Sequence, residues 1–244
     1  MPRFFVNKDR ISEDKIYIDG SDAHHIARSL RMAEGDEAVV CDGAGNEYRC
    51  SLSRIRDEEC ECEILEKINT GSEPNMTITL FMAYPKGDKL ETVIQKAVEL
   101  GACRIVPFES SRCIKRPKAE KAEKQTARLS RIAEEAAKQC GRAIIPTVSA
   151  PMSYKEMLAE AGSSEIAFFC YEAEDGVSIK EALAKCDAPK SIAVIVGSEG
   201  GFSVDEAEAA KAAGCISISL GKRILRCETA PAYALSAISY RYEL

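Results

Sequence analysis

The chain has 244 residues, of which 45% are hydrophobic and 30% are charged, and its formal net charge is −6. These proportions are typical of a globular protein and exclude a wholly disordered chain. No apolar run approaches the roughly 18 residues that span a bilayer, and the first residues lack the apolar stretch of a signal peptide. We therefore expect a cytosolic (cytoplasmic) protein with one large domain or two modest ones and no membrane partner.

Residues 1–70 are predicted to form a small β-rich domain. Strand patterns occur in four places: 15–18, 38–41, 47–52 and 61–65. A strong turn signal at 42–46 lies between the second and third strands. One helix is expected over 22–30, with Ser21 or Asp22 as its cap. Short strands at this spacing indicate a small barrel.

A polar linker is expected at 71–75, and the pattern changes after it. From residue 76 to residue 244, apolar strand patterns alternate with helical spacing. The strands are expected at 76–84, 104–108, 165–171, 192–196 and 215–220. The helices are expected at 88–100, 119–140, 154–161, 178–185, 204–213 and 230–240. Strands that are apolar on both faces and alternate with helices predict a parallel α/β sheet.

The eleven cysteines and two histidines bear on metal and redox chemistry. Cys60 and Cys62 form the only close cysteine pair, and no C-x-x-C motif occurs. His24 and His25 are adjacent and lie far in sequence from most of the cysteines. Because a zinc site needs four ligands at recognisable spacing, we expect no metal. The cysteines are expected to be reduced and mostly buried.

The charge is unevenly distributed. Residues 112–142 carry ten Lys or Arg against four Glu, a balance of +6, so the remaining chain carries −12. The run has two interpretations, a solvated helix face or a surface for a polyanion. Polyanion binding depends on local positive charge rather than on the net charge of the chain.

The segment IVGSEGGFS at 195–203 lies at the end of a predicted strand, just before a helix. Ligands bind at such strand ends in open α/β sheets. The glycines do not form G-x-G-x-x-G, and no G-K-[ST] follows, so neither common nucleotide motif is present. The Glu199 carboxylate would repel a phosphate and suits a ligand with hydroxyls or positive charge. The alternative is an ordinary tight turn.

A second strand-end segment, LGKRILRCETA, occupies 220–230. It holds three cations and one carboxylate, with Ile224 and Leu225 between them. These two apolar residues are expected to pack on something, either a ligand ring or the sheet edge. Glu228 and Thr229 fall at the expected start of the last helix, so helix capping is the alternative role for both.

These two segments resemble the signature loops of SPOUT-class RNA methyltransferases. Three further stretches narrow the resemblance to the RsmE family, which methylates N3 of a uridine in 16S ribosomal RNA: HHIARSLRMAEGDEAVVCDG, KGDKLETVIQKAVELGACRIVPFESSRC and AEEAAKQCGR. The resemblance implies a PUA-like barrel followed by an α/β domain with a trefoil knot. It also implies S-adenosylmethionine as cofactor, the small ribosomal subunit as substrate and a homodimer.

The resemblance also assigns cofactor-binding residues. They are Phe169, Tyr171, Glu172, Gly197, Glu199, Gly200, Gly201, Leu220, Gly221, Ile224, Leu225 and Ala230. Two positions depart from the family pattern. Ser198 stands where the family commonly has proline, so this loop is expected to be less rigid. Cys227 stands where it commonly has threonine, so a hydroxyl contact is expected to be lost.

Uridine N3 carries a proton and is a poor nucleophile until that proton leaves. Arg226 and Glu228 are two residues apart and are expected to be catalytic. The cation would stabilise the developing anion, while the carboxylate, held ionised by the arginine, accepts the proton. Contacts with RNA phosphates are expected from Arg3, Arg10, Arg28, Arg31, Arg112, Lys115, Arg116 and Arg142.

Two other functions remain open at this point. The glycine loop also suits a nucleotide-cofactor oxidoreductase, although the missing G-x-G-x-x-G motif and Glu199 argue against it. The chain is alternatively a non-catalytic RNA-binding or assembly factor, against which Arg226 and Glu228 argue. The segment 230–238, APAYALSAI, is almost wholly apolar or small. We expect it to form a dimer interface, the alternative being burial within one subunit.

Overall fold

The computed structural model describes residues 1–114, 119–173 and 177–244. The chain folds into two compact units, Met1–Glu73 with Glu135–Ile145, and Pro74–Glu134 with Pro146–Leu244. Residues 135–145 therefore belong with the first unit, whereas the division expected from the sequence placed all of 76–244 in the second domain. The long helix α3 (Ala119–Cys140) contributes residues to both units.

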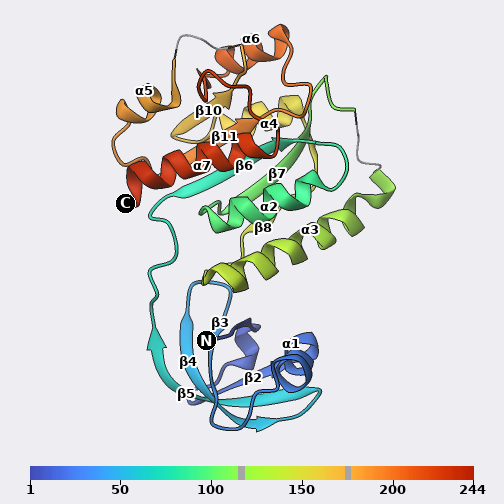
Figure 1. Cartoon of the computed structure of the whole chain (residues 1–244), viewed down its shortest axis with the longest axis vertical. Helices are drawn as coiled ribbons and strands as arrows, with labels where there is room; N and C mark the ends of the chain where they lie inside the picture. The colour runs from blue at the N-terminus through green and yellow to red at the C-terminus, as the bar shows by residue number, and fades with distance from the viewer. Residues whose placement is uncertain (115–118, 174–176) are drawn as a thin grey trace. The chain divides into compact units, whose positions relative to one another are not determined.

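The first unit is built on a five-stranded sheet with the order β1-β3-β4-β5-β2. The strands are β1 (Arg3–Phe5), β2 (Lys15–Asp19), β3 (Glu37–Cys41), β4 (Glu47–Ile55) and β5 (Glu59–Ile68). The pair β1–β3 is parallel and the other pairs are antiparallel. Two register shifts interrupt the β4–β5 pairing. Such shifts bend a strand and increase its twist, which helps the long hairpin curl (Figure 1).

The helical segment of this unit differs from the single helix expected over 22–30. A short 3₁₀ turn, η1 (Lys8–Arg10), precedes β2. One α-helical turn, α1 (Gly20–His24), is followed by a π-helix, η2 (His25–Leu30). The expected cap was wrong, because the N-cap is Asp19 and makes no side-chain capping bond. Gly20, whose φ is +62°, follows β2 directly and is the first residue of α1, so the helix begins one residue before Ser21.

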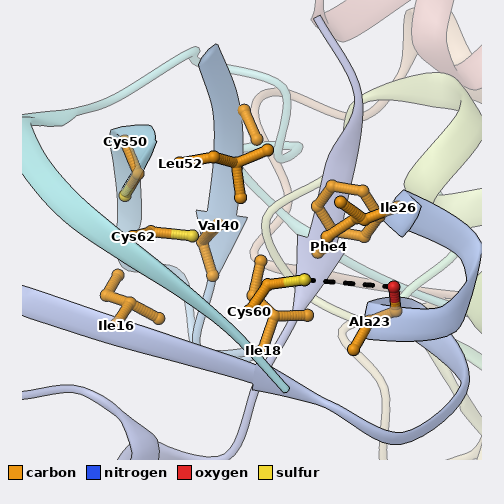
Figure 2. Packing of buried hydrophobic residues seen from close by; sticks show 11 residues of the cluster. Phe4, Ile16, Ile18, Ala23, Ile26, Val40, Cys50, Leu52, Cys60 and Cys62 are labelled. Carbon is orange, nitrogen blue, oxygen red and sulfur yellow. Dashed lines mark hydrogen bonds between the residues drawn. The ribbon is translucent and has the colours of Figure 1, made fainter. Parts of the chain in front are cut away.

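The core of the first unit combines aliphatic residues with cysteines (Figure 2). Cys50, Cys60 and Cys62 are fully buried beside Ile16 and Ile18. Burial raises the pKa of the Cys50 and Cys62 thiols to about 12. All eleven cysteines of the chain are free, and eight of them are buried. The prediction that the cysteines are mostly buried is confirmed, and their reduced state stays a prediction.

The second unit contains a seven-stranded parallel sheet with the order β12-β10-β11-β6-β7-β8, and β9 also pairs with β7. Its strands are β6 (Thr77–Ala83), β7 (Arg104–Glu109), β8 (Thr147–Val148), β9 (Met152–Ser153), β10 (Ile166–Cys170), β11 (Ser191–Val196) and β12 (Ile216–Ile218). The central strands β6, β10 and β11 are almost entirely buried. The predicted α/β class with a parallel sheet is therefore confirmed.

Helices follow the strands in this unit. They are α2 (Lys89–Glu99), α3, α4 (Tyr154–Ala161), α5 (Ile179–Ala184), α6 (Val204–Ala212) and α7 (Thr229–Tyr242). Ser153, Ser178 and Ser203 each begin a helix with a complete capping box. The capping boxes fix where each helix begins, and the one at Ser203 thereby fixes the end of the segment between β11 and α6. The trefoil knot expected from the resemblance stays a prediction.

No helix among the described residues combines the length and apolar character that a membrane span requires.

Candidate functional site

A cavity of about 480 Å³ opens at the carboxyl ends of three neighbouring strands, β10, β11 and β12. The chain after each strand lines it, at 170–172, 196–201 and 219–227. Lys89, at the start of α2, and Ala230, in the first turn of α7, complete the wall. Because parallel strands end at one edge, segments far apart in sequence meet here, as expected for a ligand site in an open α/β sheet.

The segment Gly197–Gly201, here called the glycine loop, is closely packed on the protein side. The Gly201 N–H donates to the Ser198 carbonyl at 3.0 Å, which closes a tight turn. Gly201 has a φ of +61°, and a Cβ there would collide with the Glu172 carboxylate. At Gly197 a Cβ would lie 3.1 Å from the Gly201 Cα. Glycine is therefore required by this loop's own conformation and packing.

The segment Leu220–Glu228, here called the cationic loop, is much more exposed than the glycine loop. Lys222, Arg223 and Arg226 are all exposed, and Ile224 has 89% of its surface accessible. At the end of the loop, the Arg226 carbonyl accepts hydrogen bonds from the Thr229 and Ala230 N–H groups at 2.8 and 2.9 Å. These bonds start α7, so the helix holds the end of the loop while its middle faces the cavity.

Three charged side chains form a cluster at the rim of the cavity. Lys89 Nζ lies 3.0 Å from Glu199 Oε1 and 3.4 Å from Glu228 Oε2. Lys89 Nζ also lies 3.8 Å from Cys227 Sγ, and that thiol donates to Glu228 Oε2 at 3.2 Å. The backbone N–H of Lys86 donates to Glu199 at 3.1 Å. One ammonium thus joins the glycine loop to the end of the cationic loop.

Both carboxyl groups of the cluster are favoured in their ionised form. The pKa of Glu228 is lowered by its own backbone N–H and then by Cys227 and Lys89, which outweigh partial burial. For Glu199, burial is the largest effect and raises the pKa, but hydrogen bonds from its own backbone, Lys89 and Lys86 bring it below its ordinary value. The pKa of Lys89 is raised, mainly by its hydrogen bond to Glu199.

This geometry changes one expected role. The sequence suggested that Arg226 keeps Glu228 ionised, but among the described residues the cation paired with Glu228 is Lys89. The sequence reasoning missed Lys89 as a site residue. The available signal was its position in KGDKLE, directly after an apolar strand and at the start of a helix. Only the fold reveals that this strand, β6, neighbours β11.

The cavity collects most of the residues expected to bind the cofactor. Of the twelve, all except Phe169 line it. Phe169 is fully buried beneath the loops, with its ring centroid 4.3 Å from that of Phe202. Of the two residues expected to be catalytic, Arg226 lines the cavity, and Glu228 lies next to the lining residue Cys227.

The two departures from the family pattern have distinct surroundings. Cys227 is buried, and its thiol donates to Glu228, so a polar contact is kept at this position although the hydroxyl is absent. The Ser198 hydroxyl is buried and has no hydrogen-bond partner within the described part of the chain.

The arginines expected to contact RNA fall into different classes. Arg3 pairs with Glu47 at 2.6 Å, and Arg142 pairs with Glu73 at 2.7 Å. Both arginine side chains are buried, so they are not available to contact RNA phosphates as the sequence suggested. Their charges are engaged inside the first unit, as neutralisation of buried ions requires. Three of the other residues expected to contact RNA lie in the first unit: Arg10 pairs with Asp19 and Glu59, Arg28 is exposed beside Asp57, and Arg31 is exposed. Lys115 and Arg116 lie outside the described residues.

Arg112 is exposed, but its guanidinium does not simply face solvent. Its Nη1 donates to the carbonyl of Gly200 in the glycine loop at 3.0 Å.

The described residues contain no group of three or more His, Cys, Asp or Glu side chains placed to hold a metal ion. The site is therefore built from glycine backbone, carboxylates, cations and the exposed apolar residue Ile224.

Comparisons with known proteins agree with this arrangement. Residues 72–239 match the model of an RNA methyltransferase domain, and residues 18–65 match that of an RNA methyltransferase PUA domain. The fold and site thus define an RNA methyltransferase with a PUA domain.

Individual relatives narrow the class. The chain is 36% identical to the ribosomal RNA small subunit methyltransferase E of Bacillus subtilis, over 100% of this chain and 98% of that protein. It is 32% identical to the protein of the same name from Synechocystis, over 97% of this chain and 77% of that one. The crystal structure of such an enzyme from Neisseria gonorrhoeae, bound to S-adenosyl methionine, is 32% identical with a TM-score of 0.86, covering 98% and 97% of the chains. The chain belongs to the ribosomal RNA small subunit methyltransferase E family.

Proposed function

We propose that this protein methylates N3 of a uridine in the 16S ribosomal RNA of the small subunit, with S-adenosylmethionine as methyl donor. The observation that carries the proposal is the cavity at the ends of β10, β11 and β12, which Arg226 lines and beside which Glu228 follows the lining residue Cys227. Family membership and the S-adenosyl methionine in the Neisseria gonorrhoeae structure support the choice of cofactor. Such an enzyme works on ribosomal subunits in the cytoplasm.

The residues present fit this cofactor. A cavity of about 480 Å³ is within the range of roughly 300–1,000 Å³ that small-molecule sites occupy. Ile224 and Leu225 offer apolar surface to a ring, and the glycine loop lets backbone approach closely. Glu172 and Glu199 suit hydroxyls and positive charge. When bound, the cofactor supplies a methyl group already activated by a sulfonium, so no metal is required.

Proton removal from the uridine falls to residues of the cationic loop. The Glu228 carboxylate is held ionised by its backbone N–H, Cys227 and Lys89, and it accepts the N3 proton. Arg226 is exposed at the cavity and stabilises the negative charge that develops on the base. Placing the methyl donor against N3 contributes roughly 7–11 kcal/mol, so positioning is the larger effect.

Exposed cations give RNA a surface to bind. Lys124, Arg128 and Arg131 are exposed on α3 at a spacing that places them on one face of the helix. Arg28 and Arg31 are exposed in the first unit. Phosphate contacts by such residues supply sequence-independent affinity. The target uridine must be splayed out of the RNA structure to reach the cavity.

The active unit is proposed to be a homodimer, in which α7 contributes other residues to the interface than the alanines expected from the sequence. Ala234 is only 1% exposed and packs inside the subunit with Leu235 and Ile238, so it is not an interface residue. Tyr240 is 77% exposed, and Tyr233 also faces away from the core. These two tyrosines, rather than the alanines, form the face of α7 available to a second copy. Tyr240→Arg should then yield monomers in light scattering, while Ala234→Arg should unfold the subunit.

The alternative is a non-catalytic RNA-binding or assembly factor that retains the fold. The experiment that separates the two is incubation of unmodified small ribosomal subunits with labelled S-adenosylmethionine, followed by mapping of the label. Label on N3 of one uridine in 16S RNA is the expected result. Subunits that bind the protein but acquire no label would support the alternative.

A further inference from the structure

A short turn at Ser110–Cys113 follows β7 and lies against the glycine loop. The turn is fixed from within, because the Cys113 N–H donates to the Ser110 carbonyl at 3.1 Å. The Ser110 hydroxyl contacts Cys113 Sγ at 3.2 Å, and both residues are buried. The turn is therefore a firm support from which the side chain of Arg112 extends.

Two hydrogen bonds attach this turn to the loop and helix that follow β11. Arg112 Nη1 donates to the Gly200 carbonyl at 3.0 Å. The Ser111 N–H donates to Glu206 Oε1 at 2.7 Å, while Glu206 Oε2 accepts the Ser203 N–H at 2.9 Å. Glu206 is buried, so it ties the turn to the first residues of α6 with one side chain. The glycine loop is thus held before and after Gly201.

The packing at Gly200 points to the same support. A Cβ on Gly200 would lie 2.9 Å from the Arg112 Cβ and 3.2 Å from the Arg112 carbonyl oxygen. Contacts this short are not accommodated without movement of the backbone. Gly200 is therefore glycine partly because Arg112 packs on it, independently of any ligand.

We infer that Arg112 is a positioning residue that holds the glycine loop in its cofactor-binding shape, rather than simply a phosphate contact. The inference rests on the proposed function only in taking this cavity as the S-adenosylmethionine site. The Gly200 carbonyl accepts its hydrogen bond from Arg112, in the turn after β7, so the glycine loop already has this conformation before a ligand binds. Preorganisation of this kind reduces the ordering cost of binding.

The test compares Arg112→Ala with Arg54→Ala, a matched control that removes an exposed arginine of the first unit. Calorimetry with S-adenosylhomocysteine measures cofactor-site affinity without catalysis. Hydrogen exchange of the Gly201 amide, in protein without added ligand, reports whether its bond to Ser198 stays closed. Arg112→Lys, which keeps the charge, tests whether the guanidinium itself is needed.

We expect Arg112→Ala to weaken S-adenosylhomocysteine binding about tenfold, as loss of a hydrogen bond from a charged donor implies, and to speed Gly201 exchange. Arg54→Ala should change neither quantity, and Arg112→Lys should recover only part of the loss. If Arg112→Ala folds and changes RNA affinity alone, with cofactor affinity and Gly201 exchange intact, the inference is overturned. Failure of the wild type to bind S-adenosylhomocysteine would instead contradict the proposed function.

Discussion

The glycine loop and the cationic loop line the same cavity, but the protein supports them differently. A Cβ would clash with protein atoms at Gly200 and Gly201, and at Gly197 it would lie only 3.1 Å from the nearest atom. In the cationic loop, by contrast, Gly221 has open space around it, and Ile224 is 89% exposed. One wall of the site is thus held by the fold, while the middle of the other depends less on it.

This difference indicates a division of labour. A loop held by packing presents its backbone in one shape, which suits recognition of a ligand by close approach. Full burial of an exposed isoleucine side chain is favourable by roughly 1.5–3 kcal/mol. Contact between Ile224 and the bound cofactor would therefore contribute to the free energy of binding. We therefore expect substitutions in the glycine loop to affect stability and binding together, and those in the cationic loop to affect binding or chemistry alone.

The largest effect is expected at the catalytic end of the cationic loop. Glu228→Gln removes the proton acceptor and should lower kcat by about 10²–10⁴-fold, the range of general base catalysis. Affinity for S-adenosylhomocysteine should stay within about twofold of wild type, because the amide keeps the volume of the side chain. Single-turnover methylation of small subunits measures this, with Glu208→Gln on the exposed face of α6 as control. An unchanged kcat would remove Glu228 from the mechanism.

A substitution in the glycine loop should lower both the stability of the protein and its affinity for the cofactor. Gly200→Val places side-chain atoms against Arg112 and should lower the free energy of unfolding by roughly 1–3 kcal/mol, the usual cost of overpacking. Cofactor affinity should fall by about tenfold to a hundredfold in calorimetry. Gly200→Ala should show the same changes to a smaller degree. A Gly200→Val protein with wild-type stability and affinity would contradict close packing of this loop.

Lys89 links the two loops, so its removal sharpens the comparison. Loss of the ammonium in Lys89→Met removes one of the interactions that lower the pKa of Glu228. That pKa should rise, so the acid limb of the pH profile for kcat should move to higher pH, with about a fivefold lower rate on the acid side. Lys96→Met, on the same helix, provides the control. A profile that falls in height without moving would mean that Lys89 acts only through structure.

The smallest effect is expected at the exposed apolar residue. Ile224→Ser should weaken S-adenosylhomocysteine binding about fivefold, equivalent to about 1 kcal/mol, with no change in melting temperature. Val204→Ser removes another exposed apolar side chain outside the cavity and should leave binding unchanged. If both variants bind equally well, Ile224 has no role in the ligand site.

The sequence predicted the fold well wherever one element decides its own structure. The spacing of apolar residues placed α3 and α4 at their observed bounds, because helix periodicity and capping are local. It did not predict β1, a three-residue strand whose pairing with β3 is parallel and depends on distant residues. It also predicted one helix where α1 and the π-helix η2 follow each other, since their difference lies in hydrogen-bond register.

For the site, the sequence identified groups but not their partners. Strand-end position and unusual composition were enough to single out the glycine loop and the cationic loop. The pairing of Lys89 with Glu228, and of Arg112 with Gly200, spans 139 and 88 positions and depends on strand order. Arg3 and Arg142 look like free cations in the sequence, and only the structure reveals that they are buried and paired with Glu47 and Glu73.

Amide hydrogen exchange across both loops, with and without S-adenosylhomocysteine, tests the comparison most directly. We predict that the Gly201 amide is protected in the protein alone and gains little on binding, because its bond to Ser198 is already made. Amides of the cationic loop around Ile224 should exchange fast in the protein alone and become protected when the ligand binds. Equal, fast exchange in both loops without ligand would contradict a pre-shaped glycine loop.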